Sequence, residues 1–136
     1  MNKKRIAVFI VILIILAIVA IFSMRIYFLN QIGDIVSESI LNDNYKSEYI
    51  SNSNIQKIRD EAYAYENDSF KVNSLECSYD HENWIENFVW VDVWLNTNDG
   101  ERAEHYKCYF RIEKGRVYIT DVGISIAEDG SATDLD

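Results

Sequence analysis

The pattern of apolar and polar positions changes twice along this 136-residue chain. The first stretch, "IAVFIVILIILAIVAIFSM" (residues 6–24), is apolar except for Ser23. As a helix, a run of this length spans roughly 28 Å at about 1.5 Å per residue, close to the ~30 Å hydrocarbon core of a bilayer. We therefore predict a transmembrane anchor over residues 6–28, with membrane contact through residues 6–24, preceded by a basic tip at residues 1–5. A cleaved signal peptide, which has a shorter apolar region, is the alternative.

Two helical patterns follow the apolar run. Apolar residues after Arg25 recur at spacings of three and four, which is typical of a helix: Leu29, Ile32, Val36 and Ile40. Gly33 is the expected weak point of this helix. A second helix is predicted from "SNIQKIRDEAYAYEND", where Ser53 stands three residues before Gln56 in a capping-box pattern, and it should end near Asn67. Each helix has one apolar stripe that needs a partner.

The period then changes to two, which is the period of strands. We expect strands over residues 70–79 and 85–96, a third strand after the turn signal Asp99-Gly100, and a fourth over residues 116–126. The chain is therefore predicted to be an α+β protein: an N-terminal transmembrane helix, then two helices packed on a four-stranded antiparallel meander sheet. This domain covers residues 29–126, and residues 127–136 form an acidic flexible tail.

The second predicted strand alternates small apolar with large aromatic residues. A turn centred on Asp99-Gly100 pairs Val91 with Cys108 and Asp92 with Lys107. We expect the face that takes the helices to hold the valines and four residues of the third strand: Tyr106, Cys108, Phe110 and Ile112.

Three aromatic residues fall on the opposite face: Trp90, Trp94 and Tyr109. Exposed aromatic patches often mark contact sites, so these three are the candidate partner-binding residues. In the alternative interpretation, the ends of the chain cover them.

The charges are unevenly distributed around the apolar run. Lys3, Lys4 and Arg5 precede it, Arg25 follows it, and every Asp and Glu lies later in the chain. The whole chain has a net charge of −9, while the residues after Arg25 carry nine Lys and Arg against 22 Asp and Glu, a net charge of −13. The positive-inside rule then predicts a cytoplasmic N-terminus and a domain outside the cell membrane. An acidic surface also argues against a nucleic-acid partner.

The sequence contains no phosphate-binding glycine loop, nucleophile elbow or zinc ligand set. We therefore predict no catalytic residues, no metal site and no cofactor, and expect that the chain is not an enzyme. The "DHE" at residues 80–82 is expected to be a solvated turn, and His105 to have a packing role. Cys77 and Cys108 are either a disulfide or two free core cysteines.

The order of elements resembles the cystatin-like and nuclear-transport-factor-like superfamily of cone-shaped α+β domains. "ESILNDNYKSEYIS" (38–51) is similar to that family's early helix and its break, and "YFRIEKGRVYITDVG" (109–123) to its closing hairpin. Membrane-anchored members include assembly proteins of bacterial type IV secretion and conjugation systems. The resemblance implies a single-pass, extracytoplasmic interaction or assembly module of a bacterial envelope or conjugative complex, with a protein partner or a homo-oligomer.

Two other functions are compatible with the sequence. The cone of such a domain can bind a small apolar or peptidic ligand, which requires a cavity between helices and sheet. A pilin-like subunit also has an apolar N-terminal helix followed by a small sheet.

Overall fold

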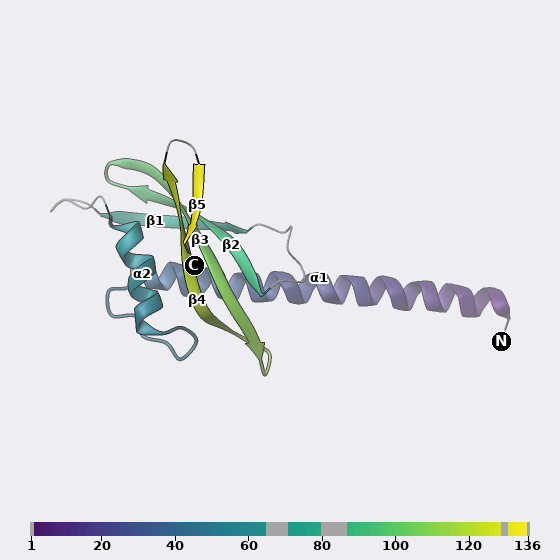
Figure 1. Cartoon of the computed structure of the whole chain (residues 1–136). Helices are drawn as coiled ribbons and strands as arrows, with labels where there is room; N and C mark the ends of the chain where they lie inside the picture. Colours follow the sequence, from purple (N-terminus) through teal and green to yellow (C-terminus); the bar gives the residue numbers. More distant parts are fainter. Residues whose placement is uncertain (1, 65–70, 80–86, 129–130, 136) are drawn as a thin grey trace. The chain divides into compact units, whose positions relative to one another are not determined.

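The computed structural model describes residues 2–64, 71–79, 87–128 and 131–135, and these form two helices and five strands (Figure 1). The chain divides into two compact units, Met1–Asn30 and Gln31–Asp136. Helix α1 (Lys3–Leu41) begins in the first unit and contributes residues 31–41 to the second.

In the first unit, α1 is apolar on all sides. Side chains such as Val8, Leu13 and Phe22 are exposed around the helix, and a helix that is apolar all round belongs in a membrane or in a protein interior. Within the described part of the chain, α1 is the one helix long and apolar enough to cross a membrane. Its length and composition fit a membrane anchor or a signal sequence.

The second unit begins with the last turns of α1. The helix continues through Gly33 to Leu41, so the predicted weak point does not break it. Helix α2 (Asn52–Ala62) has Ser51 as its N-cap, and the Ser51 hydroxyl accepts a hydrogen bond from the N–H of Asn54 at 3.3 Å. The predicted cap at Ser53 is therefore two residues late, because Ser51 has the extended backbone that an N-cap requires.

The five strands form one antiparallel sheet in sequential order. They are β1 (Val72–Tyr79), β2 (Phe88–Thr97), β3 (Gly100–Glu113), β4 (Arg116–Glu128) and β5 (Ser131–Leu135). The α+β class and the meander are confirmed. The sheet also has a fifth strand, in the segment expected to be a flexible tail, and β5 pairs with β4 from Ile124 opposite Leu135 to Glu128 opposite Ser131. Ladder hydrogen bonds are made by the backbone, so an edge strand can form without large apolar side chains.

The β2–β3 turn lies one residue earlier than predicted. Thr97 pairs with Gly100, which leaves Asn98 and Asp99 in the loop. The Thr97 hydroxyl holds this turn, because it donates to the Gly100 carbonyl at 2.7 Å and accepts from the Asp99 N–H at 3.1 Å. Gly100 has φ +117°, which favours glycine. Every β2–β3 pair therefore shifts by two residues.

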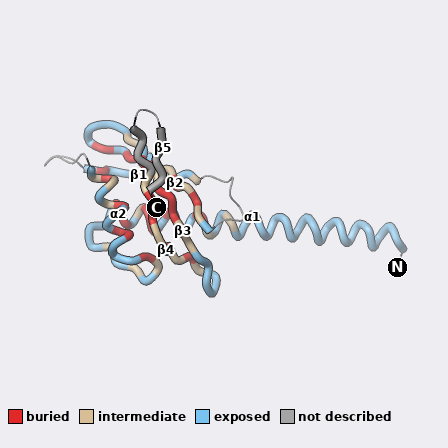
Figure 2. Tube along the Cα trace, in the orientation of Figure 1, coloured by how far each residue is buried: buried red, intermediate tan, exposed pale blue. Residues whose placement is uncertain are grey.

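The shift changes partners but preserves faces, because side chains alternate with a period of two. Val91 pairs with Tyr106 and Asp92 with His105, so the predicted pairing of Asp92 with Lys107 is wrong. Five of the seven side chains expected to face the helices are nevertheless buried: Val89, Val91, Val93, Tyr106 and Cys108. Figure 2 shows buried stretches of the sheet in red.

A β-bulge in β4 changes which side chains of that strand point to the inner face. Tyr109 pairs with Asp121 while Phe110 pairs with Ile119, so Thr120 is an extra residue on β4. The alternation resets there. Ile119 before the bulge and Val122 after it are consequently both buried.

The end of the β3–β4 hairpin extends beyond the core. Glu113 pairs with Arg116, which leaves a two-residue turn of Lys114 and Gly115. Ile112 is 48% exposed and Phe110 half-buried. The predicted core position of Ile112 is wrong, because the strand has left the layer covered by the helices.

Candidate interaction surface

The sheet has an inner face, which packs on α2 and the end of α1, and an outer face. Tyr106 on the inner face is fully buried, and its hydroxyl donates to the Ile58 carbonyl of α2 at 3.0 Å. We define the outer face by the β2 and β3 side chains that point the other way: Phe88, Trp90, Asp92, Trp94, His105, Lys107 and Tyr109. The three candidate aromatic residues all belong to it.

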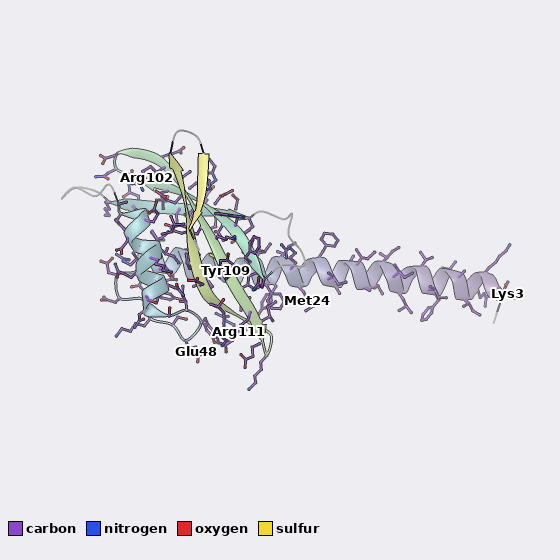
Figure 3. All side chains as sticks on the ribbon, in the orientation of Figure 1. Lys3, Met24, Glu48, Arg102, Tyr109 and Arg111 are labelled. Carbon is purple, nitrogen blue, oxygen red and sulfur yellow. The ribbon has the colours of Figure 1, made fainter. Side chains whose placement is uncertain are left out.

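Lys107 lies among aromatic rings at one end of the outer face. Its Nζ atom is 4.5 Å from the ring centroid of Phe88, 5.2 Å from that of Tyr109 and 5.8 Å from that of Trp90. The Phe88 and Tyr109 rings also contact each other, with centroids 5.7 Å apart. Lys107 is only 9% exposed. The rings of Trp90 and Tyr109 therefore both contact the Lys107 cation. Tyr109 is labelled in Figure 3.

The next cross-strand pair along the outer face joins a carboxylate to an imidazole. Asp92 Oδ1 and His105 Nδ1 are 2.5 Å apart, and both side chains are partly exposed. The carboxylate accepts, so the ring nitrogen donates. His105 thus has a polar partner instead of the predicted packing role against Trp94. This pair separates Trp90 from Trp94 along β2.

Trp94 is the exposed member of the aromatic set, with 53% of its surface accessible. Its cross-strand neighbours are Glu76 on β1 and Ala103 on β3. Trp94, Glu76 and Glu101 line a surface pocket of about 370 Å³. The indole therefore lines a surface pocket together with two carboxylate side chains, which suits contact with a partner more than internal packing.

The space between helices and sheet is filled in the described residues. Ile58, Val93, Tyr106 and Val117 have no exposed surface, so these side chains of α2 and three strands are packed on all sides. A second surface pocket, of about 470 Å³, lies where the ends of α1 and α2 meet the start of β1, and its lining includes Arg59 and Asp60. This polar hollow differs from the apolar cavity that a ligand-binding cone needs.

Cys77 and Cys108 are free thiols on strands separated by β2. Strands two apart lie roughly 9.5 Å from each other, beyond the ~7 Å Cα separation that a disulfide tolerates. Burial raises the pKa of Cys108 to about 12 and also raises the pKa of Cys77, whose Sγ lies 3.6 Å from the Ser37 hydroxyl. Both thiols therefore stay protonated and poorly nucleophilic near neutral pH.

The structure brings the three predicted residues to one face but divides them between two roles. Trp90 and Tyr109 surround Lys107, whereas Trp94 faces solvent. Sequence reasoning missed the enclosure of Lys107 and the proximity of Glu76 to Trp94, because both depend on strand register. Among the described residues, no group of three or more His, Cys, Asp or Glu side chains could hold a metal ion, and His81 lies outside those residues.

Comparisons with family models, with curated proteins and with solved structures find no match to this chain.

Proposed function

We propose that the chain is a single-pass membrane protein with a cytoplasmic N-terminus and an extracytoplasmic domain that binds a protein partner through the outer face around Trp94. The observation that carries this proposal is the exposure of Trp94, an aromatic residue that contributes nothing to solubility and stands beside a pocket. Trp is among the residues that contribute most to protein–protein binding energy.

Two further observations support a membrane-bound interaction module. The apolar first part of α1 has the length of a bilayer span, with three cations before it and one after it. The filled interior of the second unit also favours a protein-binding role over a ligand-binding cone. Membership of the cystatin-like and nuclear-transport-factor-like superfamily, and a place in a bacterial envelope or conjugative assembly, belong to the same proposal and are supported by the order of helices and strands.

The experiment uses a photoreactive amino acid placed at position 94 of the whole chain in its native membrane. We expect a discrete cross-linked protein adduct from position 94 and none from Asp99, an exposed position in the β2–β3 turn. Trp94→Ala should weaken capture of the same partner at unchanged thermal stability. Trp90→Ala should instead lower stability, because Trp90 covers Lys107.

Identical adducts from positions 94 and 99 would show non-specific contact and exclude this surface as the binding site. If Trp94→Ala lowers the melting temperature as much as Trp90→Ala does, Trp94 has a packing role and not a binding role.

A further inference from the structure

The end of the β3–β4 hairpin has the opposite charge to the rest of its domain. We define the hairpin tip as residues 111–116, which contain Arg111, Lys114 and Arg116 against a single acid, Glu113. Its net charge is thus +2, whereas the residues after Arg25 sum to −13. Figure 1 shows this turn at the opposite end of β3 from the β2–β3 turn.

The hairpin tip combines exposed cations with an exposed apolar residue. Ile112 is 48% exposed and stands between Arg111, which Figure 3 labels, and Glu113. The Arg111 Nε atom is 3.3 Å from a Glu113 carboxylate oxygen. Lys114 and Gly115 both have positive φ, 52° and 74°, as a tight two-residue turn requires. The Lys114 side chain is therefore presented at the extreme end of the hairpin.

Tyrosine rings flank the hairpin tip. The Arg111 guanidinium lies 4.8 Å from the Tyr118 ring centroid, and the Arg116 guanidinium 4.1 Å from that of Tyr49. The two rings contact each other edge-on at 5.2 Å. Tyrosines, long cationic side chains and an exposed aliphatic residue are the composition that proteins place at the boundary of lipid and water.

A hydrogen bond ties the hairpin to the start of the second unit. The N–H of Val117 donates to the side-chain carbonyl of Gln31 at 2.9 Å. Gln31 follows Met24, the last residue of the apolar run, by seven positions. Seven residues span at most about 25 Å even when fully extended. Chain length therefore sets an upper limit of about 25 Å on the distance from Met24 to Gln31, the residue that holds Val117 of the hairpin, whatever the arrangement of the two units.

We propose that the hairpin tip rests on the anionic lipid headgroups beside the anchor. Arg111 and Lys114 contact lipid phosphates, and Ile112 enters the interfacial layer. This proposal rests on the membrane anchoring in the proposed function. The attraction of the tip and the repulsion of the acidic remainder act in the same direction, so together they orient the domain on an anionic surface.

The test uses the whole chain reconstituted in vesicles of phosphatidylglycerol or of phosphatidylcholine. Nitroxide labels are attached through Ile112→Cys at the hairpin tip and, in a separate protein, through Asp99→Cys in the opposite turn, both in a Cys77→Ala background that leaves the buried Cys108 in place. In phosphatidylglycerol we expect the label at 112 to be shielded from a water-soluble relaxation agent and exposed to oxygen, and the label at 99 to stay water-accessible. In phosphatidylcholine the shielding at 112 should weaken.

Two charge variants provide the matched comparison. Lys114→Asn removes one cation from the tip and suits the positive φ of that position, while Lys71→Gln removes one cation next to the opposite turn. Lys114→Asn should reduce the shielded population at 112 by about fivefold, as expected for one cation near an anionic surface, and Lys71→Gln should not change it.

Equal water accessibility at 112 and 99 in phosphatidylglycerol, or equal effects of the two charge variants, would overturn the lipid contact while leaving the anchor intact. Failure of the whole chain to float with vesicles of either composition would overturn the anchoring, and the lipid contact with it.

Discussion

The phenol oxygen of Tyr79 occupies the space that a Cβ atom at position 33 would need. An ideal Cβ built on Gly33 would lie 1.9 Å from the Tyr79 hydroxyl oxygen and 3.0 Å from Cζ, closer than real contacts allow. Gly33 therefore lets a strand side chain approach the backbone of α1. The residue that the sequence marks as a weak point is a contact point between a helix and the sheet.

Gly33→Ala should destabilise the domain by about 1–3 kcal/mol, because the clash outweighs the roughly 1 kcal/mol that Ala gains over Gly in a helix. The free energy of unfolding would be measured by denaturant titration of the whole chain in detergent micelles. In a Tyr79→Val background the same substitution should be neutral or stabilising. Equal losses in both backgrounds would show that the Tyr79 ring is not the cause.

Tyr106→Phe should cost about 1–3 kcal/mol of stability. The substitution removes the buried hydrogen bond from the Tyr106 hydroxyl to the Ile58 carbonyl and changes little else. Tyr118→Phe is the matched control, because Tyr118 is only half-buried, and it should stay within about 0.5 kcal/mol of the wild type. Similar losses from both substitutions in denaturant titrations would contradict the central position of Tyr106.

Lys107→Ala should destabilise the domain by about 1–3 kcal/mol, since a desolvated cation–π contact is worth up to about 2 kcal/mol and the side-chain stem is also packed. Lys107→Met keeps most of the stem and removes the charge. We expect Lys107→Met to lose at least half of the stability that Lys107→Ala loses. If Lys107→Met is as stable as the wild type, the whole stability loss of Lys107→Ala comes from packing of the side-chain stem.

Alkaline pH should destabilise the fold through buried groups that must stay protonated. Burial raises the pKa of Cys108 from 9.0 to about 12 and that of Tyr79 from 10.0 to about 12. Because the folded pKa values exceed the unfolded ones, the unfolded chain releases protons first as the pH rises. Stability is therefore complete below about pH 9 and falls between about pH 9 and 12, by up to about 1.4 kcal/mol per pH unit for each group.

Denaturant midpoints measured from neutral to strongly alkaline pH would follow this loss. Cys108→Ala should make the loss of stability above about pH 9 smaller and leave the part that comes from Cys77 and Tyr79, whose pKa values burial also raises. A midpoint that is constant up to about pH 11 would refute the prediction.

The topology of the anchor predicts where a C-terminal reporter works. A reporter fused after Asp136 should be active only outside the cytoplasm, and protease added to intact cells stripped of their wall should cleave the domain. If the protease cleaves the domain only after lysis, the orientation is the opposite of the predicted one.

The sequence predicted the class, order and faces of the elements because these depend on periodicity. Val89, Val91 and Val93 occupy every second position of β2, and residues two apart in a strand share a face, so all three are buried on the inner face. Register depends on finer chemistry. The Thr97 hydroxyl stabilises a turn at Asn98-Asp99, one residue before the turn that Asp99-Gly100 predicts. No local sequence pattern predicts this difference.

The same limit applies to the outer face. The sequence identified Trp90, Trp94 and Tyr109 as neighbours on one side of the sheet. Their division into an enclosure around Lys107 and an exposed indole beside Glu76 depends on which residue lies opposite which. The bulge at Thr120 is a second example, because one extra residue on β4 brings Val122 inside against the simple alternation.

The turn held by Thr97 also bears on how such a protein can change over time. Moving the two-residue turn by one position, from Asn98-Asp99 to Asp99-Gly100, would slide β2 along β3 by two positions and still leave every valine on the inner face. On the other side of the sheet, each side chain would acquire a new neighbour. A one-position change in a surface turn can therefore give every side chain of the outer face new neighbours while the valines remain on the inner face.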